Sequence, residues 1–188
     1  MIKIAVDCFG GDHSPAANID GALLALAAFP DLHVILSGDE AQIQAHLADK
    51  SYDKERLSIL HAPDVIGCDE KPTDAIRLKK ESSMMKAIRL LREDETVSGI
   101  VSTGSTGALV AAATLRVGRL AGVIRPAFCP IMPTMNGGVV GVCDSGANVD
   151  ITPDYQVGLG GYSNAESRRN VGIADRIYTT CIALTDGD

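Results

Sequence analysis

Short apolar runs alternate with helix-forming segments along most of the chain, and this alternation constrains the fold more than any other feature. Each run is followed by a polar stretch with Gly, Asp or Ser, which is how a buried strand ends in a loop. Such alternation implies right-handed crossovers and a mostly parallel sheet with flanking helices. We therefore predict an α/β fold, with strands at residues 2–6, 32–37, 57–62, 98–102, 127–132 and 138–143.

The segments between these strands predict helices, and residues 63–81 predict a loop with one short helix. The long helices are expected at residues 15–29, 41–49, 84–93 and 108–118. Ser14, and either Ser82 or Ser83, are predicted to cap the helices that follow them. The Asn136-Gly137 pair between the last two predicted strands indicates a hairpin.

Composition limits the classes of function. The formal net charge of −7 argues against a protein that coats nucleic acid. The sequence has no apolar run of the roughly 18 residues that a membrane span requires, and its first residues read directly into a strand. We therefore predict a cytoplasmic protein. The five cysteines are odd in number and widely spaced, which predicts reduced thiols in or near the core. We expect neither a metal nor a cofactor.

The turn Ser102-Thr103-Gly104-Ser105-Thr106-Gly107 leaves a predicted strand and opens a predicted helix. Its glycines let backbone N–H groups approach a ligand closely, its hydroxyls add donors, and the helix N-terminus adds partial positive charge. The turn therefore predicts a site for phosphate or another small anion. A plain strand–helix turn with a Ser or Thr cap would have the same sequence, so that alternative stays open.

Two further polar loops, at residues 7–13 and 144–150, also follow predicted strands. The carboxyl ends of parallel strands lie at one edge of a sheet, so we expect both loops beside the glycine-rich turn. Asp12 or His13 could orient a substrate in the first loop, and Asn148 offers both donors and acceptors in the second. The same residue types also serve as helix caps and ordinary turn residues, which is the structural alternative.

Residues 71–92 concentrate positive charge in an otherwise acidic chain. Lys79 or Lys80 could reach a phosphate, or the segment could face an acidic partner. The alternative is a solvated helix face with no ligand.

Taken together and in order, six segments resemble the phosphate acyltransferase family of bacterial phospholipid synthesis over residues 1–155. The segments are IAVDCFGGDHSP, LSGDE, KPTDAIRLKKESSM, VSTGSTGAL, RPA and DSGANVD. The resemblance implies that inorganic phosphate attacks the thioester of acyl-acyl carrier protein (acyl-ACP), giving acyl phosphate and free ACP without an acyl-enzyme. The alternatives are a phosphotransacetylase-like enzyme that uses acyl-CoA, and an inactive fragment that binds phosphate or a partner.

The resemblance also implies a fold like that of isocitrate and isopropylmalate dehydrogenases, a homodimer, and peripheral membrane contact in full-length relatives. Residues 1–155 would form the family core, and residues 156–188, which lose the family pattern, a divergent or truncated tail. The predicted catalytic residues are Lys80 and Asn148. The predicted substrate-binding residues are Asp7, Gly10, Gly11, Asp12, His13, Lys79, Ser82, Ser83, Ser102, Gly104, Ser105, Thr106, Gly107, Asp144, Gly146 and Asp150.

Overall fold

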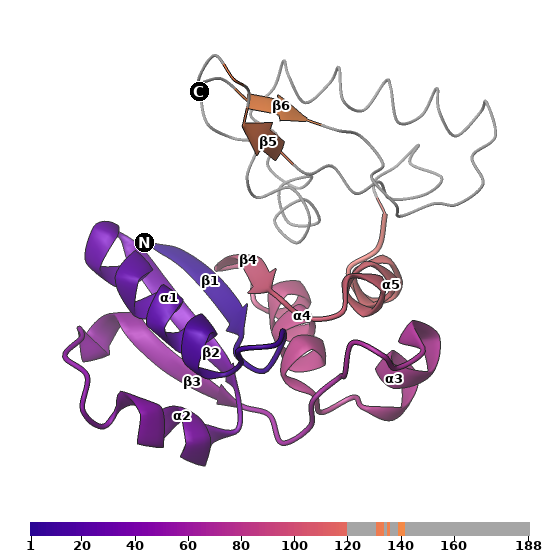
Figure 1. The fold of residues 1–188 in the computed structure, drawn as a ribbon, viewed down its shortest axis with the longest axis horizontal. Helices are drawn as coiled ribbons and strands as arrows, with labels where there is room; N and C mark the ends of the chain where they lie inside the picture. Colours follow the sequence, from indigo (N-terminus) through magenta and orange to yellow (C-terminus); the bar gives the residue numbers. More distant parts are fainter. Residues whose placement is uncertain (120–130, 134, 136–138, 142–188) are drawn as a thin grey trace. The chain divides into compact units, whose positions relative to one another are not determined.

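The computed structural model describes residues 1–119, 131–133, 135 and 139–141, and the chain divides into two units, Met1–Val117 and Gly118–Asp188. The first unit carries a parallel sheet with helices on its faces (Figure 1), which confirms the α/β prediction. The predicted core boundary at residue 155 lies outside the described residues and stays a prediction.

Four parallel strands form the sheet of the first unit: β1 (Ile2–Asp7), β2 (Leu32–Gly38), β3 (Leu57–His61) and β4 (Val97–Ser102). Their order across the sheet is β3-β2-β1-β4, so the chain moves outward from β1 to β3 and then crosses to the other side of β1. All four strands were predicted, and each differs from its predicted bounds by a single residue at one end.

Helices α1 (Ala16–Ala28) and α2 (Glu40–Leu47) cover one face of this sheet (Figure 1). Their apolar side chains, including Ile19 and Ile43, pack with Leu36 of β2 in one buried cluster. A short 3-10 helix, η1 (Lys54–Arg56), leads into β3.

Helices α3 (Pro72–Leu78), α4 (Ser83–Glu93) and α5 (Thr106–Arg116) pack in a second buried cluster on the opposite face. Ile88 of α4 and Ala112 of α5 are fully buried there with strand residues such as Ile100. Among the described residues, no helix is both long and apolar enough to cross a membrane.

Two short strands are described in the second unit, β5 (Ile131–Pro133) and β6 (Val139–Gly141). They pair antiparallel, with Met132 opposite Val140, as a hairpin requires. The predicted turn residues between them, Asn136 and Gly137, lie outside the described residues.

The helix-cap predictions are half right. The Ser82 hydroxyl accepts a hydrogen bond from the Met85 N–H at 3.3 Å and caps α4. Ser14 does not cap α1, because Pro15 occupies the cap position and the Ser14 hydroxyl instead donates to the Phe9 carbonyl at 3.3 Å. The Ser14 hydroxyl therefore hydrogen-bonds to the preceding loop and not to the start of the helix.

The cysteine prediction holds for one of the two cysteines in the described part of the chain. Cys8 is fully buried, and burial raises the pKa of its thiol to about 12, so it is an inert core residue. Cys68 is free but exposed, which corrects the prediction for that position, because it lies in the loop before α3 rather than on a packed face. The other three cysteines lie outside the described residues.

Candidate functional site at the switch point of the sheet

A row of polar side chains crosses the carboxyl end of the sheet. Ser37 on β2 and Ser102 on β4 are both in register with Asp7 on β1. The strand order reverses between β1 and β4, which makes this edge the topological switch point of the sheet. Ligands of open α/β sheets bind in the crevice that such a reversal leaves beyond the strand ends.

Asp7 is the centre of this row and is only 2% exposed. One carboxylate oxygen accepts a hydrogen bond from the Ser83 hydroxyl at 2.5 Å, and the other accepts from the Ser102 hydroxyl at 2.7 Å. Burial raises the pKa of Asp7 above its ordinary value, and the two serine hydrogen bonds oppose that rise. The carboxyl therefore ties α4 and the loop after β4 to the end of β1.

The N-terminus of α4 is fixed to the sheet from two sides. The Ser37 hydroxyl donates to the Ser83 carbonyl at 2.8 Å, and the Ser83 N–H donates to the Asp64 carbonyl at 3.0 Å. Ser82 and Ser83, both predicted site residues, are buried and occupied by these contacts and by the helix cap. Their observed role is to position α4.

The glycines of the two neighbouring loops bring their backbones together. A Cβ atom on Gly10 would lie 2.6 Å from the Gly104 nitrogen, closer than a real side chain tolerates. Gly11 has a φ of +83°, a left-handed conformation that favours glycine, and it lies against Thr103. The structure therefore brings together loops 7–13 and 102–107, as predicted from the strand ends.

Asn18 on α1 connects these two loops and was not among the predicted site residues. Its amide donates to the carbonyls of Asp7, Cys8 and Gly10 at 3.3, 3.0 and 2.8 Å. Its side-chain oxygen accepts from the Thr103 hydroxyl at 3.0 Å, and that hydroxyl also donates to the Gly10 carbonyl at 2.8 Å. The available signal was the single side-chain amide of a mostly apolar helix.

The glycine-rich turn opens α5 as predicted. The Ser105 hydroxyl accepts from the Ala108 N–H at 3.3 Å, so the capping alternative is confirmed for this residue. The N–H groups of Thr106 and Gly107 belong to the first helical turn, which has no carbonyl partners within the helix. Gly107 also lies against Pro72 at the start of α3, where a Cβ atom would be 2.9 Å from the proline ring. The turn therefore places helix-end donors beside the Asp7 junction without itself identifying a ligand.

The other charged residues predicted in this site have different surroundings. Asp12 and His13 are exposed on the first loop. The Lys79 ammonium donates to the Val65 carbonyl at 2.7 Å and pairs with Glu70 at 2.6 Å, so it braces the loop before α3. Asn148 and the predicted binding residues Asp144, Gly146 and Asp150 lie outside the described residues.

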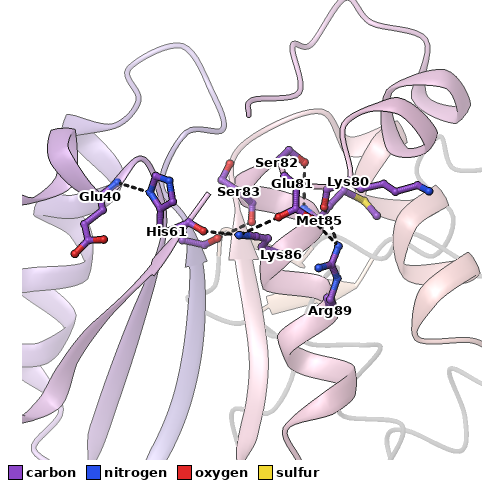
Figure 2. A network of polar contacts seen from close by, with 10 residues as sticks. Glu40, His61, Lys80, Glu81, Ser82, Ser83, Met85, Lys86 and Arg89 are labelled. Atoms are coloured by element: carbon purple, nitrogen blue, oxygen red, sulfur yellow. Dashed lines mark hydrogen bonds and ion pairs between the residues drawn. The ribbon is translucent and has the colours of Figure 1, made fainter. Parts of the chain in front are cut away.

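The basic segment continues along α4 as a chain of polar contacts (Figure 2). Glu81 lies between two cations, 3.0 Å from Lys86 and 3.3 Å from Arg89. Lys86 also donates to the His61 carbonyl at 2.8 Å. The Lys80 side chain points away from this chain of contacts, and among the described residues no carboxylate lies within ion-pair distance of its ammonium.

Comparison with known proteins gives a consistent set of relatives. A family model described as "Fatty acid synthesis protein" matches residues 2–177. The phosphate acyltransferase of Clostridium perfringens (strain SM101 / Type A) is 43% identical over 156 residues, which cover 83% of this chain and 45% of the relative.

Two further relatives carry the same name. The phosphate acyltransferase of Bacillus subtilis (strain 168) is 42% identical over 156 residues, covering 83% of this chain and 46% of the relative. The phosphate acyltransferase of Geobacillus thermodenitrificans (strain NG80-2) is 41% identical over 172 residues, which cover 90% of this chain and 51% of the relative. The chain thus spans about half the length of the curated relatives it matches.

Proposed function

The chain belongs to the fatty acid synthesis protein family, and we propose that it supplies the phosphate-binding part of an acyltransferase. The proposed reaction converts acyl-ACP and inorganic phosphate to acyl phosphate and free ACP, in fatty acid and phospholipid synthesis. The relatives named phosphate acyltransferase support the acyl and phosphate parts of this proposal.

The observation that carries the proposal is the junction at the switch point. Two backbones approach closely at Gly10 and Gly104, and the N-terminus of α5 starts beside them. Helix N-termini and glycine backbones favour a compact anion because their N–H groups point outward and carry partial positive charge. Inorganic phosphate is an anion of that size and charge.

The chemistry needs positioning more than covalent participation. A phosphate oxygen bonds to the thioester carbonyl carbon, the carbon–sulfur bond breaks, and the phosphate proton leaves with the carrier thiol. Backbone donors near the carbonyl would stabilise the negative charge that develops on its oxygen. In this proposal the Lys80 ammonium and the Asn148 amide are the catalytic donors.

Asp7 acts as a positioning residue in the same proposal. Both of its carboxylate oxygens are used by Ser83 and Ser102, and it is nearly inaccessible to solvent. A carboxylate without hydrogen bonds would repel phosphate. The Asp7 carboxylate accepts from the Ser83 and Ser102 hydroxyls, and so it positions α4 and the glycine-rich turn, whose N–H groups are the proposed donors to the anion.

The remaining parts of the proposal rest on the family resemblance alone. They are a fold related to the isocitrate and isopropylmalate dehydrogenases, a homodimer, a cytoplasmic location and peripheral membrane contact of full-length relatives.

A donor comparison tests the proposed reaction. Acyl-ACP and acyl-CoA are each incubated with the protein and labelled phosphate, and labelled acyl phosphate is measured. We expect incorporation from acyl-ACP in a full-length relative, and weak or no incorporation with this chain, which spans about half the length of its relatives. Incorporation from acyl-CoA alone would favour the phosphotransacetylase-like alternative, and no incorporation from either donor with the full-length relative would contradict the proposed reaction.

The anion site is tested by Gly104→Val, with Gly21→Val as the control. The branched side chain at Gly104 meets Gly10 and Met84, whereas nothing lies within 4 Å of a Cβ atom on Gly21. We expect phosphate affinity, measured by calorimetry, to fall at least about tenfold in the first variant, a loss of about 1.4 kcal/mol of binding free energy. Equal affinities in the two variants would contradict the proposed site.

A further inference from the structure

A concave site lies along α4. A pocket of about 350 Å³ is lined by Lys80, Met85, Arg89, Arg92, Glu93 and Arg116. Arg116 is the last residue of α5, so the pocket follows the α4–α5 surface away from the strand ends that form the switch-point site. We propose that this pocket binds a small phosphate ester. Lys80 lies two residues before Ser82, the cap of α4, and as the proposed catalytic donor it belongs to both proposals.

Charge is the first argument. Four of the six lining residues are cations and only Glu93 is an anion, in a chain whose formal net charge is −7. One of the four, Arg89, also pairs with Glu81 at 3.3 Å, which leaves an excess of about two positive charges. Within residues 1–119, neither Lys80 nor Arg116 has an ion-pair partner for its side chain. A doubly charged phosphate offsets most of this local excess, which a single carboxylate would not.

Two of the three arginines, Arg89 and Arg92, are also held in place before any ligand arrives. One amino group of Arg92 donates to the Arg116 carbonyl at 2.7 Å, and one amino group of Arg89 donates to the Lys80 carbonyl at 3.0 Å. A guanidinium has five N–H donors, so each arginine keeps donors for a ligand. Fixed guanidinium forks match the oxygens of a phosphate group, and pre-positioned side chains lose less freedom on binding.

The shape of the site favours a small molecule over a protein surface. Met85 forms an apolar part of the wall and is only 3% exposed, so the pocket is recessed into the helix packing. Its volume lies at the lower end of the range of about 300–1,000 Å³ that is usual for small-ligand sites. An ester with a phosphate and a compact apolar group would use both the cations and this wall.

Phenyl phosphate is the probe for the test, with benzenesulfonate as a singly charged analogue at the same ionic strength. Binding to the full chain is followed by calorimetry and by the NMR signals of the backbone amides and of the arginine Nε–H groups. We expect saturable binding of phenyl phosphate that shifts the signals of Arg89, Arg92 and Arg116, and weaker binding of benzenesulfonate.

Arg116→Glu should weaken phenyl phosphate binding by at least about tenfold, because it removes a charged hydrogen-bond donor and adds a repulsive charge. Lys54→Glu is the control, since Lys54 is an exposed cation of η1 outside this pocket. If Arg116→Glu does not fold, as judged by circular dichroism, the signal shifts in the natural chain decide the question.

Four results would overturn the proposal. They are no saturable binding of phenyl phosphate, equal weakening in both variants, binding of benzenesulfonate as tight as that of phenyl phosphate, and shifts confined to residues 102–107. The last result would place the phosphate at the glycine-rich turn. Because the test measures only binding, its result does not depend on whether the chain catalyses acyl transfer.

Discussion

Asp7 carries the most informative titration of the described residues, because it is buried at the centre of the junction. Burial raises its folded-state pKa above the ordinary value of 3.8. Between these two values the folded protein binds more protons than the unfolded chain, so the free energy of unfolding falls as pH rises through that window. The Asp7 contribution is therefore most favourable in acid and is lost toward neutral pH.

The matching prediction uses Asp7→Asn, which cannot titrate but can still exchange hydrogen bonds with Ser83 and Ser102. Urea unfolding of both proteins is measured from about pH 4 to about pH 7. The unfolding free energy of the natural protein relative to the variant should decrease as pH rises. The ion-paired acids elsewhere are common to both proteins and cancel in the difference, so a flat or rising difference would contradict the raised pKa.

Single residues also show which parts of the site could be predicted from the sequence and which could not. Asp7 was predictable because it ends an apolar strand in a parallel sheet, and such ends meet at one edge. Asn18 was not, because its partners are backbone carbonyls of a loop and Thr103, which is 85 residues away along the chain. Lys79 and Lys80 are adjacent in sequence, yet within the described part of the chain only Lys79 has an ion-pair partner, since the turn after α3 directs the two side chains differently.

At the scale of elements, the Gly10–Gly104 contact determines how closely the loop after β1 and the loop after β4 can approach each other. Gly10→Ala puts a Cβ atom 2.6 Å from the Gly104 nitrogen, and backbone cannot move aside as a flexible side chain can. We expect a loss of about 1–3 kcal/mol of stability, as for other overpacked sites.

Gly21→Ala is the matched control for that substitution. Gly21 lies within α1 with open space around it, and alanine is the better helix former. It should gain about 0.5–1 kcal/mol, measured by the same urea unfolding. Similar effects of the two substitutions would mean that the loops do not approach as described.

Elements were predictable where one signal dominated. Apolar runs located the four parallel strands, and Ser82 stood directly before a strongly amphipathic helix. The failure at Ser14 has a local cause, because α1 begins at Ala16 and Ser14 lies one residue before the cap position, where its hydroxyl donates to the Phe9 carbonyl. A serine that caps a helix and a serine that hydrogen-bonds to a preceding loop look alike in the sequence, and the fold determines which role the residue has.

For the whole molecule, both described hydrophobic clusters lie within Met1–Val117. One cluster joins α1 and α2 to the sheet, and the other needs Ile100 of β4 together with Ala108 and Ala112 of α5. Because all four strands of the described parallel sheet, and helices on both of its faces, lie in this unit, residues 1–117 contain what a cooperative domain requires.

We therefore expect residues 1–117, produced alone, to unfold cooperatively in urea, with a denaturant dependence of about 1–3 kcal/mol/M. Residues 1–96 are the matched control, because they lack β4 and α5 and leave Ala5 and Ile88 without their partners in the second cluster. That shorter chain should unfold gradually or not fold. Leu24 and Leu115 are 73% and 68% exposed, so the transition is measured at several protein concentrations to separate folding from association. A gradual transition for residues 1–117, or equal cooperativity of the two chains, would mean that the first unit depends on residues beyond Val117 for its stability.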